Sequence, residues 1–357
     1  MQQRKQAQLI LDDGTIFSGV SFGAETSKAG EVVFSTGMTG YPESLTDPSY
    51  RGQILVMTYP LIGNYGIPSH ESENALLKFF ESDKIQVQGL IVSDYANEHN
   101  HWNSRKSLGD WLKEHNIPAI SGIDTRTLTQ KLREKGVMLG KIIINNQNIL
   151  FDDPNKRNLV DEVSIGRKQV YKASGKKRAL LIDCGVKNNI IRSLLARNVT
   201  VIRVPWNYDF SQEKYDCIII SNGPGDPKMC TATVQNVKQA IKQKTPMLGI
   251  CLGNQILSLA AGATTYKLTY GHRSQNQPCI DIETGRCYIT SQNHGYAVNP
   301  KKLGKDWKPW FVNANDGTNE GIRHKKLPIM SVQVHPEATP GPTDTQFIFD
   351  KFLKMVK

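Results

Sequence analysis

The sequence has few cysteines and no long apolar stretch. Its 357 residues include 6 cysteines with no C-x-x-C pair among them, a pattern that argues against a disulfide framework and against a zinc ribbon. No run reaches the roughly 18 to 20 apolar residues of a membrane helix, and the first residues lack a signal-peptide pattern. We therefore expect a cytoplasmic protein without a membrane partner, whose cysteines are buried or reactive.

The positive charge of the sequence is only partly concentrated in one region. The net charge is +11, but residues 1–170 hold 18 Lys and Arg against 20 Asp and Glu, while residues 171–357 hold 26 against 13. This difference predicts two domains. No Arg-rich helix, helix-turn-helix pattern or aromatic-basic sheet motif accompanies the basic residues of the second half. We interpret them as solvated surface and expect no nucleic-acid partner.

Patterns typical of strands and helices change in order near the middle of the chain. Residues 1–150 predict a domain of mixed strands and helices. Its predicted helices cover residues 72–81, 107–115 and 125–135. Hydrophobic periodicity fades over residues 151–176, which are predicted to be a linker, and residues 177–357 alternate short apolar strands with helices. We expect an α/β protein, with an N-terminal α+β domain followed by an open, mostly parallel α/β sheet domain.

One strand of the second half ends in the motif Gly249-Ile250-Cys251-Leu252-Gly253. G-x-C-x-G is the thiol form of a nucleophile elbow, in which glycines permit a sharp turn from strand to helix. Cys251 would then lie at a helix N-terminus, where the helix dipole favours a thiolate. On this motif alone, a buried cysteine in a tight turn is an equally good interpretation.

A second strand pattern, over residues 329–334, runs directly into His335-Pro336-Glu337. His335 could take the thiol proton of Cys251, and Glu337 could orient the imidazole and stabilise its cationic form. Because ligand sites of open α/β sheets lie beyond the carboxyl ends of the strands, we expect these three residues to meet. A histidine in this position without Cys251 would be interpreted as structural.

A third strand pattern ends in a glycine-containing loop over residues 221–227, and a peptide N–H of this loop could join that of Leu252 in stabilising an oxyanion. His99 and His101 lie in a polar loop without a third ligand, so we expect no metal. His272 and His324 have no evident acid-base partner. His294 is interpreted as part of a substrate-lining turn, with a catalytic role as the alternative.

The second half resembles a class I glutamine amidotransferase domain, on the strength of the loop Gly223 to Pro227, the elbow Gly249 to Gly253, and His335-Pro336-Glu337. The first half is similar to the small subunit of glutamine-hydrolysing carbamoyl-phosphate synthase. The motifs that carry this second similarity are Gly30 to Tyr41, Leu45 to Tyr50 and Gly122 to Arg126. Together the two resemblances cover essentially the whole chain.

The resemblance implies that Cys251 attacks the side-chain amide of glutamine and that His335 and Glu337 complete the catalytic set. Ammonia would pass through a tunnel to a large synthetase subunit that makes carbamoyl phosphate from bicarbonate and two ATP. It implies no cofactor in this chain, ATP and Mg²⁺ on the large subunit, and a heterodimer or a higher assembly of heterodimers. The glutamine contacts implied by the resemblance are Ser49, Gly223, Gly225, Leu252, Gln255, Asn293, Gly295 and Tyr296.

The chain departs from the family pattern in two places. Asn254 follows the elbow where the family usually has histidine, and the stretch 271–278 lacks two usual glycines and a histidine before proline. Neutral drift is the favoured account of both, and a tuned or partner-regulated site is the alternative. A non-catalytic scaffold and a stand-alone glutamine hydrolase are the alternative functions, and the sequence leaves open whether the product serves arginine or pyrimidine synthesis.

Overall fold

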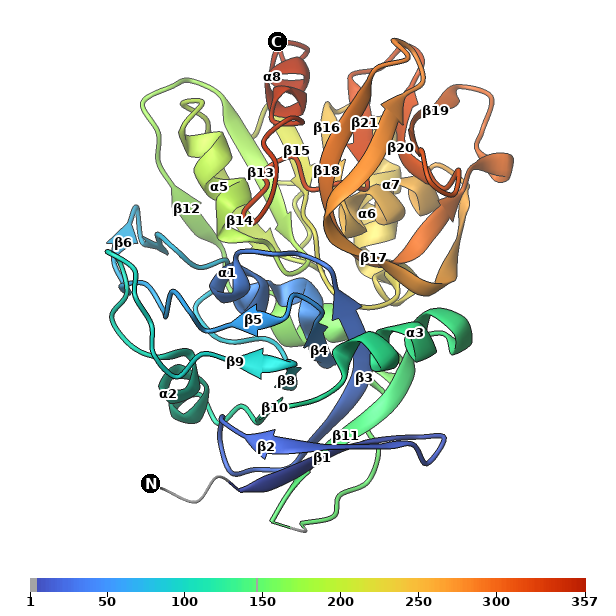
Figure 1. Cartoon of the computed structure of the whole chain (residues 1–357). Coiled ribbons are helices and arrows are strands. Elements are labelled where there is room, and N and C mark those ends of the chain that lie inside the picture. Colours follow the sequence, from blue (N-terminus) through green and yellow to red (C-terminus); the bar gives the residue numbers. More distant parts are fainter. Residues whose placement is uncertain (1–4, 146) are drawn as a thin grey trace. The chain divides into compact units, whose positions relative to one another are not determined.

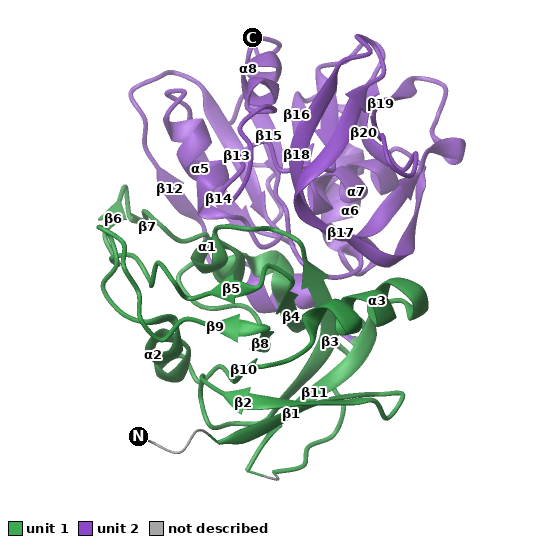
Figure 2. Ribbon diagram, viewed as in Figure 1, with its two compact units in different colours: residues 1–156 green, residues 157–357 purple. Residues whose placement is uncertain are grey.

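The computed structural model describes residues 5–145 and 147–357. Contacts within the chain divide it into two units, residues 1–156 and residues 157–357 (Figure 2). Among the described residues, no helix has both the length and the apolar character needed to cross a membrane.

The first unit is built on a closed barrel of seven strands in the order β1-β11-β3-β4-β8-β10-β2. The barrel strands are β1 (Gln6–Leu11), β2 (Ile16–Ser21), β3 (Lys28–Ser35), β4 (Gln53–Met57), β8 (Gly89–Ile91), β10 (Ala119–Ser121) and β11 (Met138–Ile144). Strands β3, β4, β8 and β10 run parallel, and the remaining pairs are antiparallel. Strands β1 and β2 form an antiparallel hairpin at the start of the chain.

Three helices accompany the barrel: α1 (Tyr41–Thr46), α2 (Leu108–Glu114) and α3 (Thr125–Lys135). Caps fix where two of them begin, because Ser107 Oγ accepts from the N–H of Asp110 at 3.1 Å and Asp124 Oδ1 accepts from the N–H of Thr127 at 2.9 Å. The sequence predicted both α2 and α3 within one or two residues.

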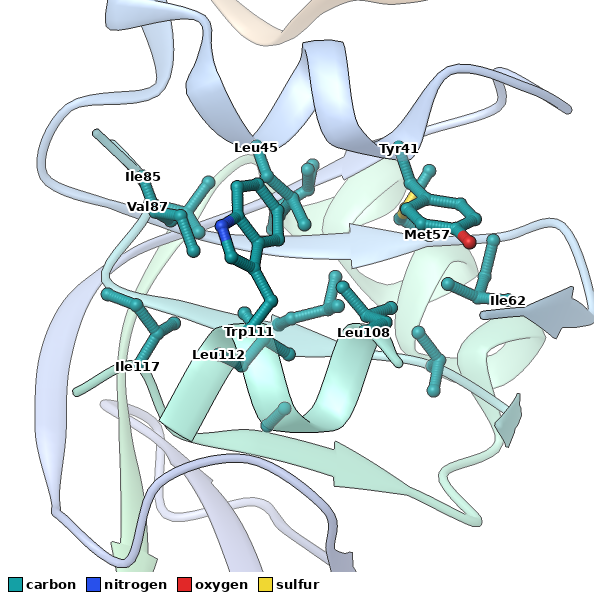
Figure 3. Packing of buried hydrophobic residues seen from close by; sticks show 14 of the residues in the cluster. Tyr41, Leu45, Met57, Ile62, Ile85, Val87, Leu108, Trp111, Leu112 and Ile117 are labelled. Atoms are coloured by element: carbon teal, nitrogen blue, oxygen red, sulfur yellow. The ribbon is translucent and has the colours of Figure 1, made fainter. Parts of the chain in front are cut away.

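Trp111 of α2 anchors the apolar core of this unit (Figure 3). It is 1% exposed, and its ring lies 5.5 Å from that of Phe80. Leu45, Val87 and Ile117 surround it in the same cluster. Burying each aliphatic side chain of this size contributes roughly 1.5 to 3 kcal/mol to folding.

The helix predicted over residues 72–81 is wrong. The structure has a short antiparallel hairpin there, β6 (Ser72–Glu73) and β7 (Leu76–Leu77). The two residues between the strands have positive φ, 52° at Asn74 and 61° at Ala75. Two consecutive positive φ values make the turn that a two-residue hairpin requires, and they are incompatible with a helix. A further small sheet pairs β5 (Leu61–Ile62) with β9 (Asp94–Tyr95).

The second unit contains a ten-stranded sheet in the order β12-β14-β13-β15-β16-β21-β20-β18-β17-β19 (Figure 1). Its parallel part consists of β14 (Thr200–Pro205), β13 (Arg178–Asp183), β15 (Cys217–Ile220), β16 (Met247–Ile250) and β21 (Ile329–Val332). Strands β15, β16 and β21 are the three that were predicted to end in the site loops. Most residues of the parallel strands are buried because helices cover the sheet.

The other strands of this sheet are antiparallel, which the sequence did not predict. They are β12 (Gln169–Tyr171), β17 (Thr264–Asp281), β18 (Cys287–Asn299), β19 (Trp307–Asn313) and β20 (Asn319–His324). The prediction of a mostly parallel sheet therefore describes the five parallel strands, three of which, β15, β16 and β21, end in the predicted site loops.

The helices of the second unit are α4 (Leu159–Val163), α5 (Asn188–Leu195), α6 (Thr231–Lys242), α7 (Leu252–Ala260) and α8 (Phe347–Leu353). Residues 157–176 of the predicted linker belong to this unit, since they contain α4 and the edge strand β12. Hydrogen bonds hold this polar stretch, among them one from the N–H of Ile165 to Asp183 Oδ2 at 2.9 Å. Polar hydrogen bonds of this kind produce no periodic pattern of hydrophobic residues, so hydrophobic periodicity could not identify the stretch as part of the domain.

Candidate active site

Cys251 lies in a sharp turn between β16 and α7. Its φ of 53° and ψ of −106° are rare for a residue with a side chain, and such conformations cluster at functional sites. A Cβ atom at Gly249 would clash with the carbonyl oxygen of Gly253, and one at Gly253 would clash with that of Ile220. The glycines of G-x-C-x-G are therefore required by close backbone packing.

The Cys251 side chain is buried, with 1% of the residue exposed. Its Sγ lies 3.6 Å from the carbonyl oxygen of Asn293 and 3.6 Å from Nε2 of Gln333. The next residue, Leu252, is the first of α7, where a peptide N–H has no intrahelical acceptor. The turn thus places a sulfur atom beside a backbone donor suited to an oxyanion.

His335 and Glu337 follow the adjacent parallel strand β21. Ile250 pairs with Val332, so the two loops leave the sheet at the same edge. Nδ1 of His335 lies 2.6 Å from Oε1 of Glu337, and both side chains are buried. The other ring nitrogen, Nε2, has no hydrogen-bond partner within the described residues. It is left for a reacting group.

The charges around His335 favour its protonated form. Burial would lower the pKa of His335, but the carboxylate of Glu337 and then the sulfur of Cys251 raise it to about 10. The interaction with sulfur places Cys251 and His335 in one electrostatic system, although they are 84 positions apart in sequence. Such an arrangement suits a thiolate–imidazolium pair.

Lys187 is a member of this site that the sequence analysis missed. Its Nζ lies 3.1 Å from Oε1 of Glu337 and donates to the carbonyl oxygen of Ala338 at 2.6 Å, with 2% of the residue exposed. Burial would raise the pKa of Glu337, but the charges of Lys187 and then His335 lower it to about 2. The position of Lys187 in a loop after β13, at the same sheet edge, was the available signal. We call Cys251, Lys187, His335 and Glu337 the catalytic edge.

The loop after β15 also reaches this edge of the sheet. A Cβ atom at Gly223 would clash with the carbonyl oxygen of Cys184 and approach the side chain of Leu252, and Gly225 has a φ of 83°. Asn222, buried in the same loop, accepts from the N–H of Lys187 at 3.0 Å. The loop therefore lies against the start of α7 and supports Lys187.

The other predicted glutamine contacts divide between the two units. Gln255 Nε2 donates to the carbonyl oxygen of Tyr296 at 2.8 Å, and Gly295 and Asn293 precede that residue on β18. Ser49 belongs to the first unit, where it is buried in a short 3-10 helix and its N–H donates to Asp47 Oδ1 at 2.9 Å. Its contribution to glutamine binding stays a prediction.

A second buried group of titratable side chains lies in the antiparallel part of the sheet. His272, His294 and Glu320 offer ligand atoms within 4.8 Å of one another, and two histidines with a carboxylate are a set that zinc accepts. Nε2 of His272 also lies 2.9 Å from Asp316 Oδ2, and its Nδ1 lies 3.4 Å from Glu320 Oε1. We call these four residues the histidine–carboxylate cluster. It corrects the prediction that His272 lacks an acid-base partner.

A proton on His272 can balance the carboxylates of this cluster without a metal ion. Burial would lower the pKa of His272, but Glu320 and then Asp316 raise it above its ordinary value. Burial and then the charge of His272 hold the pKa of His294 well below its ordinary value. His294 Nδ1 faces the carbonyl oxygen of Tyr296 at 2.8 Å, so this histidine supports the part of β18 that carries Asn293, and the turn predicted around His294 is a strand.

Two family descriptions match the chain. Residues 9–142 match the CPSase domain of the carbamoyl-phosphate synthase small chain, and residues 180–355 match glutamine amidotransferase class-I.

Three similar proteins extend over nearly the whole chain. It is 55% identical to the multifunctional protein CAD of Squalus acanthias, with 98% of this chain and 16% of that protein aligned. It is 51% identical to the multifunctional protein pyr1-3 of Dictyostelium discoideum, with 99% and 17% aligned. It is 50% identical to the mitochondrial carbamoyl-phosphate synthase [ammonia] of Mus musculus, with 99% and 24% aligned. The chain thus spans between about a sixth and a quarter of the length of these relatives.

Proposed function

The chain belongs to the family of the carbamoyl-phosphate synthase small chain and carries a class-I glutamine amidotransferase domain, and from this membership we propose that it hydrolyses glutamine to supply ammonia for carbamoyl-phosphate synthesis. The observation that carries the proposal is the catalytic edge, in which a cysteine on a strained turn is coupled to a buried His–Glu pair. Overall similarity alone would not separate glutamine from ammonia as the nitrogen source, because the name of one relative specifies ammonia.

The first half of the reaction would form a thioester. Cys251 Sγ bonds to the side-chain amide carbon of glutamine, and the carbonyl oxygen becomes an oxyanion that accepts from the N–H of Leu252 and from a peptide N–H of the Gly223 loop. Nε2 of His335 passes its proton to the departing nitrogen, the C–N bond breaks, and ammonia leaves.

The second half would return the enzyme to its starting state. Water attacks the thioester carbon while His335 Nε2, now neutral, accepts one of its protons. The C–S bond breaks, glutamate leaves, and the thiolate–imidazolium pair forms again. Lys187 keeps Glu337 ionised during both halves, and Glu337 keeps the imidazole oriented through Nδ1.

The remaining parts of the proposal concern groups outside this chain. Ammonia would pass to a large synthetase subunit, as a separate chain in a heterodimer or as the remainder of a longer polypeptide, which uses bicarbonate and two ATP. We assign ATP and Mg²⁺ to that subunit and no cofactor to this chain, because each step above uses one of its own groups. Ser49 would contribute to glutamine binding from the first unit. The greater length of the relatives supports a large partner.

The test is ammonia release from glutamine by the purified chain, alone and with the large subunit, for wild type and Cys251→Ala. We expect weak release by the chain alone, an increase with the partner, and none in the variant. Release that persists in Cys251→Ala would refute the assigned nucleophile. No release with the partner and ATP would favour the scaffold alternative, and full activity that no partner changes would favour the stand-alone hydrolase.

A further inference from the structure

Gln333 is a buried amide that contacts the sulfur of Cys251 and that the mechanism above does not use. It follows β21, two residues before His335, and is 0% exposed. Its Nε2 donates to Cys251 Sγ across 3.6 Å. An uncharged side chain in contact with the attacking atom can act only through the direction of its dipole, so the orientation of the amide decides its effect.

The surrounding hydrogen bonds fix that orientation. The carbonyl oxygen of Tyr296 can only accept, so the Gln255 atom that faces it at 2.8 Å is Nε2. The same Nε2 faces Gln333 at 3.0 Å, so the Gln333 atom on that side must be the acceptor Oε1. The Nε2 of Gln333 is therefore the atom directed at the sulfur.

Asn254 holds the same oxygen from a second side. Its Nδ2 donates to Gln333 Oε1 at 3.1 Å, and its Oδ1 accepts from Ser331 Oγ at 2.7 Å. Asn254 is 0% exposed. Two donors on one oxygen leave the Gln333 amide no alternative rotation that would satisfy both of them.

The sulfur of Cys251 has one backbone contact and one side-chain contact. The two contacts favour different protonation states of the thiol. The carbonyl oxygen of Asn293 accepts from a neutral thiol but has no proton to offer a thiolate. Gln333 Nε2 is a donor and stabilises the anion. The titratable groups connected to this site are His335 and Glu337 after β21, Lys187 before α5, and His294 on β18.

We propose that Gln333 is a further catalytic residue, which stabilises the Cys251 thiolate through its amide N–H, and that Asn254 is a positioning residue that fixes the Gln333 amide. The proposal rests on the proposed function to the extent that Cys251 is its nucleophile. It also gives Asn254 a role, in place of the neutral drift expected from the sequence. The histidine that the family usually has at this position could donate an N–H to Gln333 Oε1 equally well, so the two residues would be alternatives for the same role.

The test measures thiolate formation directly, on the full chain without glutamine or a partner. Iodoacetamide alkylates the thiolate, forming a C–S bond as iodide leaves, so the rate against pH gives the midpoint for thiolate formation. Cys287 is exposed and would also react, so the measurement uses a Cys287→Ala background, with mass spectrometry of the Cys251 peptide.

We expect Gln333→Leu to raise the midpoint by about 1 to 2 pH units, the worth of one hydrogen bond to a charged group. Gln333→Glu, which keeps the shape but replaces the donor with a carboxylate, should raise it at least as far. Asn254→Ala should give a smaller rise, and Asn254→His should restore the wild-type midpoint. Gln86→Leu removes another buried glutamine, in the first unit, and should leave the midpoint unchanged.

Unchanged midpoints in both folded Gln333 variants, with near-ultraviolet circular dichroism as the check of folding, would overturn the proposal. A rise in Gln333→Leu that Asn254→Ala does not share would remove the positioning role of Asn254. This test is independent of the test of the proposed function. If the wild type releases ammonia but the Gln333 variants have unshifted midpoints, only the role of Gln333 is refuted. If the midpoints shift but the wild type releases no ammonia, only glutamine hydrolysis is refuted.

Discussion

The catalytic edge and the histidine–carboxylate cluster both bury histidines among charged groups in the same unit, but the charged groups differ. The catalytic edge contains one carboxylate and a lysine, whereas the cluster contains two carboxylates. In the catalytic edge, Lys187 faces the Glu337 carboxylate, and the His335 pKa rises to about 10. In the cluster, His272 is shared by two carboxylates, while burial and the charge of His272 hold the pKa of His294 well below its ordinary value. Burial alone therefore does not set the protonation state of a histidine. Its nearest charged neighbours decide whether it carries a proton for chemistry or serves the fold.

The largest expected difference between the two regions is in activity. His335→Asn removes the group that moves protons, so ammonia release should fall by about 10³-fold or more. His272→Asn, the matched change in the cluster, should reduce it by less than about 10-fold. The measurement is kcat for glutamine hydrolysis with the partner present. Equal losses in the two variants would contradict the division of roles.

A second difference should appear in stability. Lys187→Met leaves the buried Glu337 carboxylate with one positive neighbour fewer, and breaking a buried ion pair costs about 3 to 5 kcal/mol of unfolding free energy. Urea denaturation measures this loss. The double variant Lys187→Met with Glu337→Gln, which removes both charges, should recover much of the stability. A double variant as unstable as Lys187→Met would show that packing of Lys187, and not its charge, matters.

The two shifted groups of the catalytic edge should also set the pH limits of stability. The pKa of Glu337 falls from 4.5 to about 2 on folding, so its stabilising contribution is present above pH 4.5 and is lost as the pH falls toward 2. The pKa of His335 rises from 6.5 to about 10, so its contribution is present below pH 6.5 and is lost as the pH rises through 10. The check is the unfolding free energy against pH. Glu337→Gln should flatten the acid limb, and an unaltered acid limb would refute the assignment.

The smallest expected effect is on the stability that the histidine–carboxylate cluster contributes. His272→Gln keeps a donor for one carboxylate but removes the positive charge, so the unfolding free energy should drop by about 1 to 2 kcal/mol. Addition of Zn²⁺ to the wild type tests whether the cluster binds a metal ion. If Zn²⁺ raises the melting temperature of the wild type but not that of His272→Gln, the cluster holds a metal and not only a proton.

The sequence predicted the part of the site that depends on strand ends. Cys251, His335 and Glu337 each follow a short apolar strand, and parallel strands bring their carboxyl ends to one edge. Lys187 and Gln333 were missed because lysine and glutamine usually lie on the surface, and nothing in a single sequence shows that these two are buried. The pattern thus located the proposed reacting groups but not the buried side chains that contact them.

The fold shows the same division. The parallel strands and the capped helices α2 and α3 carry local signals, whereas β17 and β18 are long strands with polar residues and bulges that hide an alternating pattern. The error at residues 72–81 came from apolar residues that fit a helical spacing while Asn74 and Ala75 formed a turn. Turn conformations of this kind depend on the hairpin that surrounds them, which a helical periodicity does not encode.

The closed barrel of the first unit has a consequence for assembly. Each of its seven described strands has a hydrogen-bonded neighbour on both sides, although β2 pairs with β10 only at Val20 and Ser21, so the barrel has no outermost strand. The ten-stranded sheet, in contrast, has a free edge at β12, which pairs with β14 alone among the described strands, whereas β19 pairs with both β17 and β20. If the proposed large subunit docks on the barrel, it would recognise mainly side chains and loops there, and a sheet shared between the two proteins would start at a free edge such as β12.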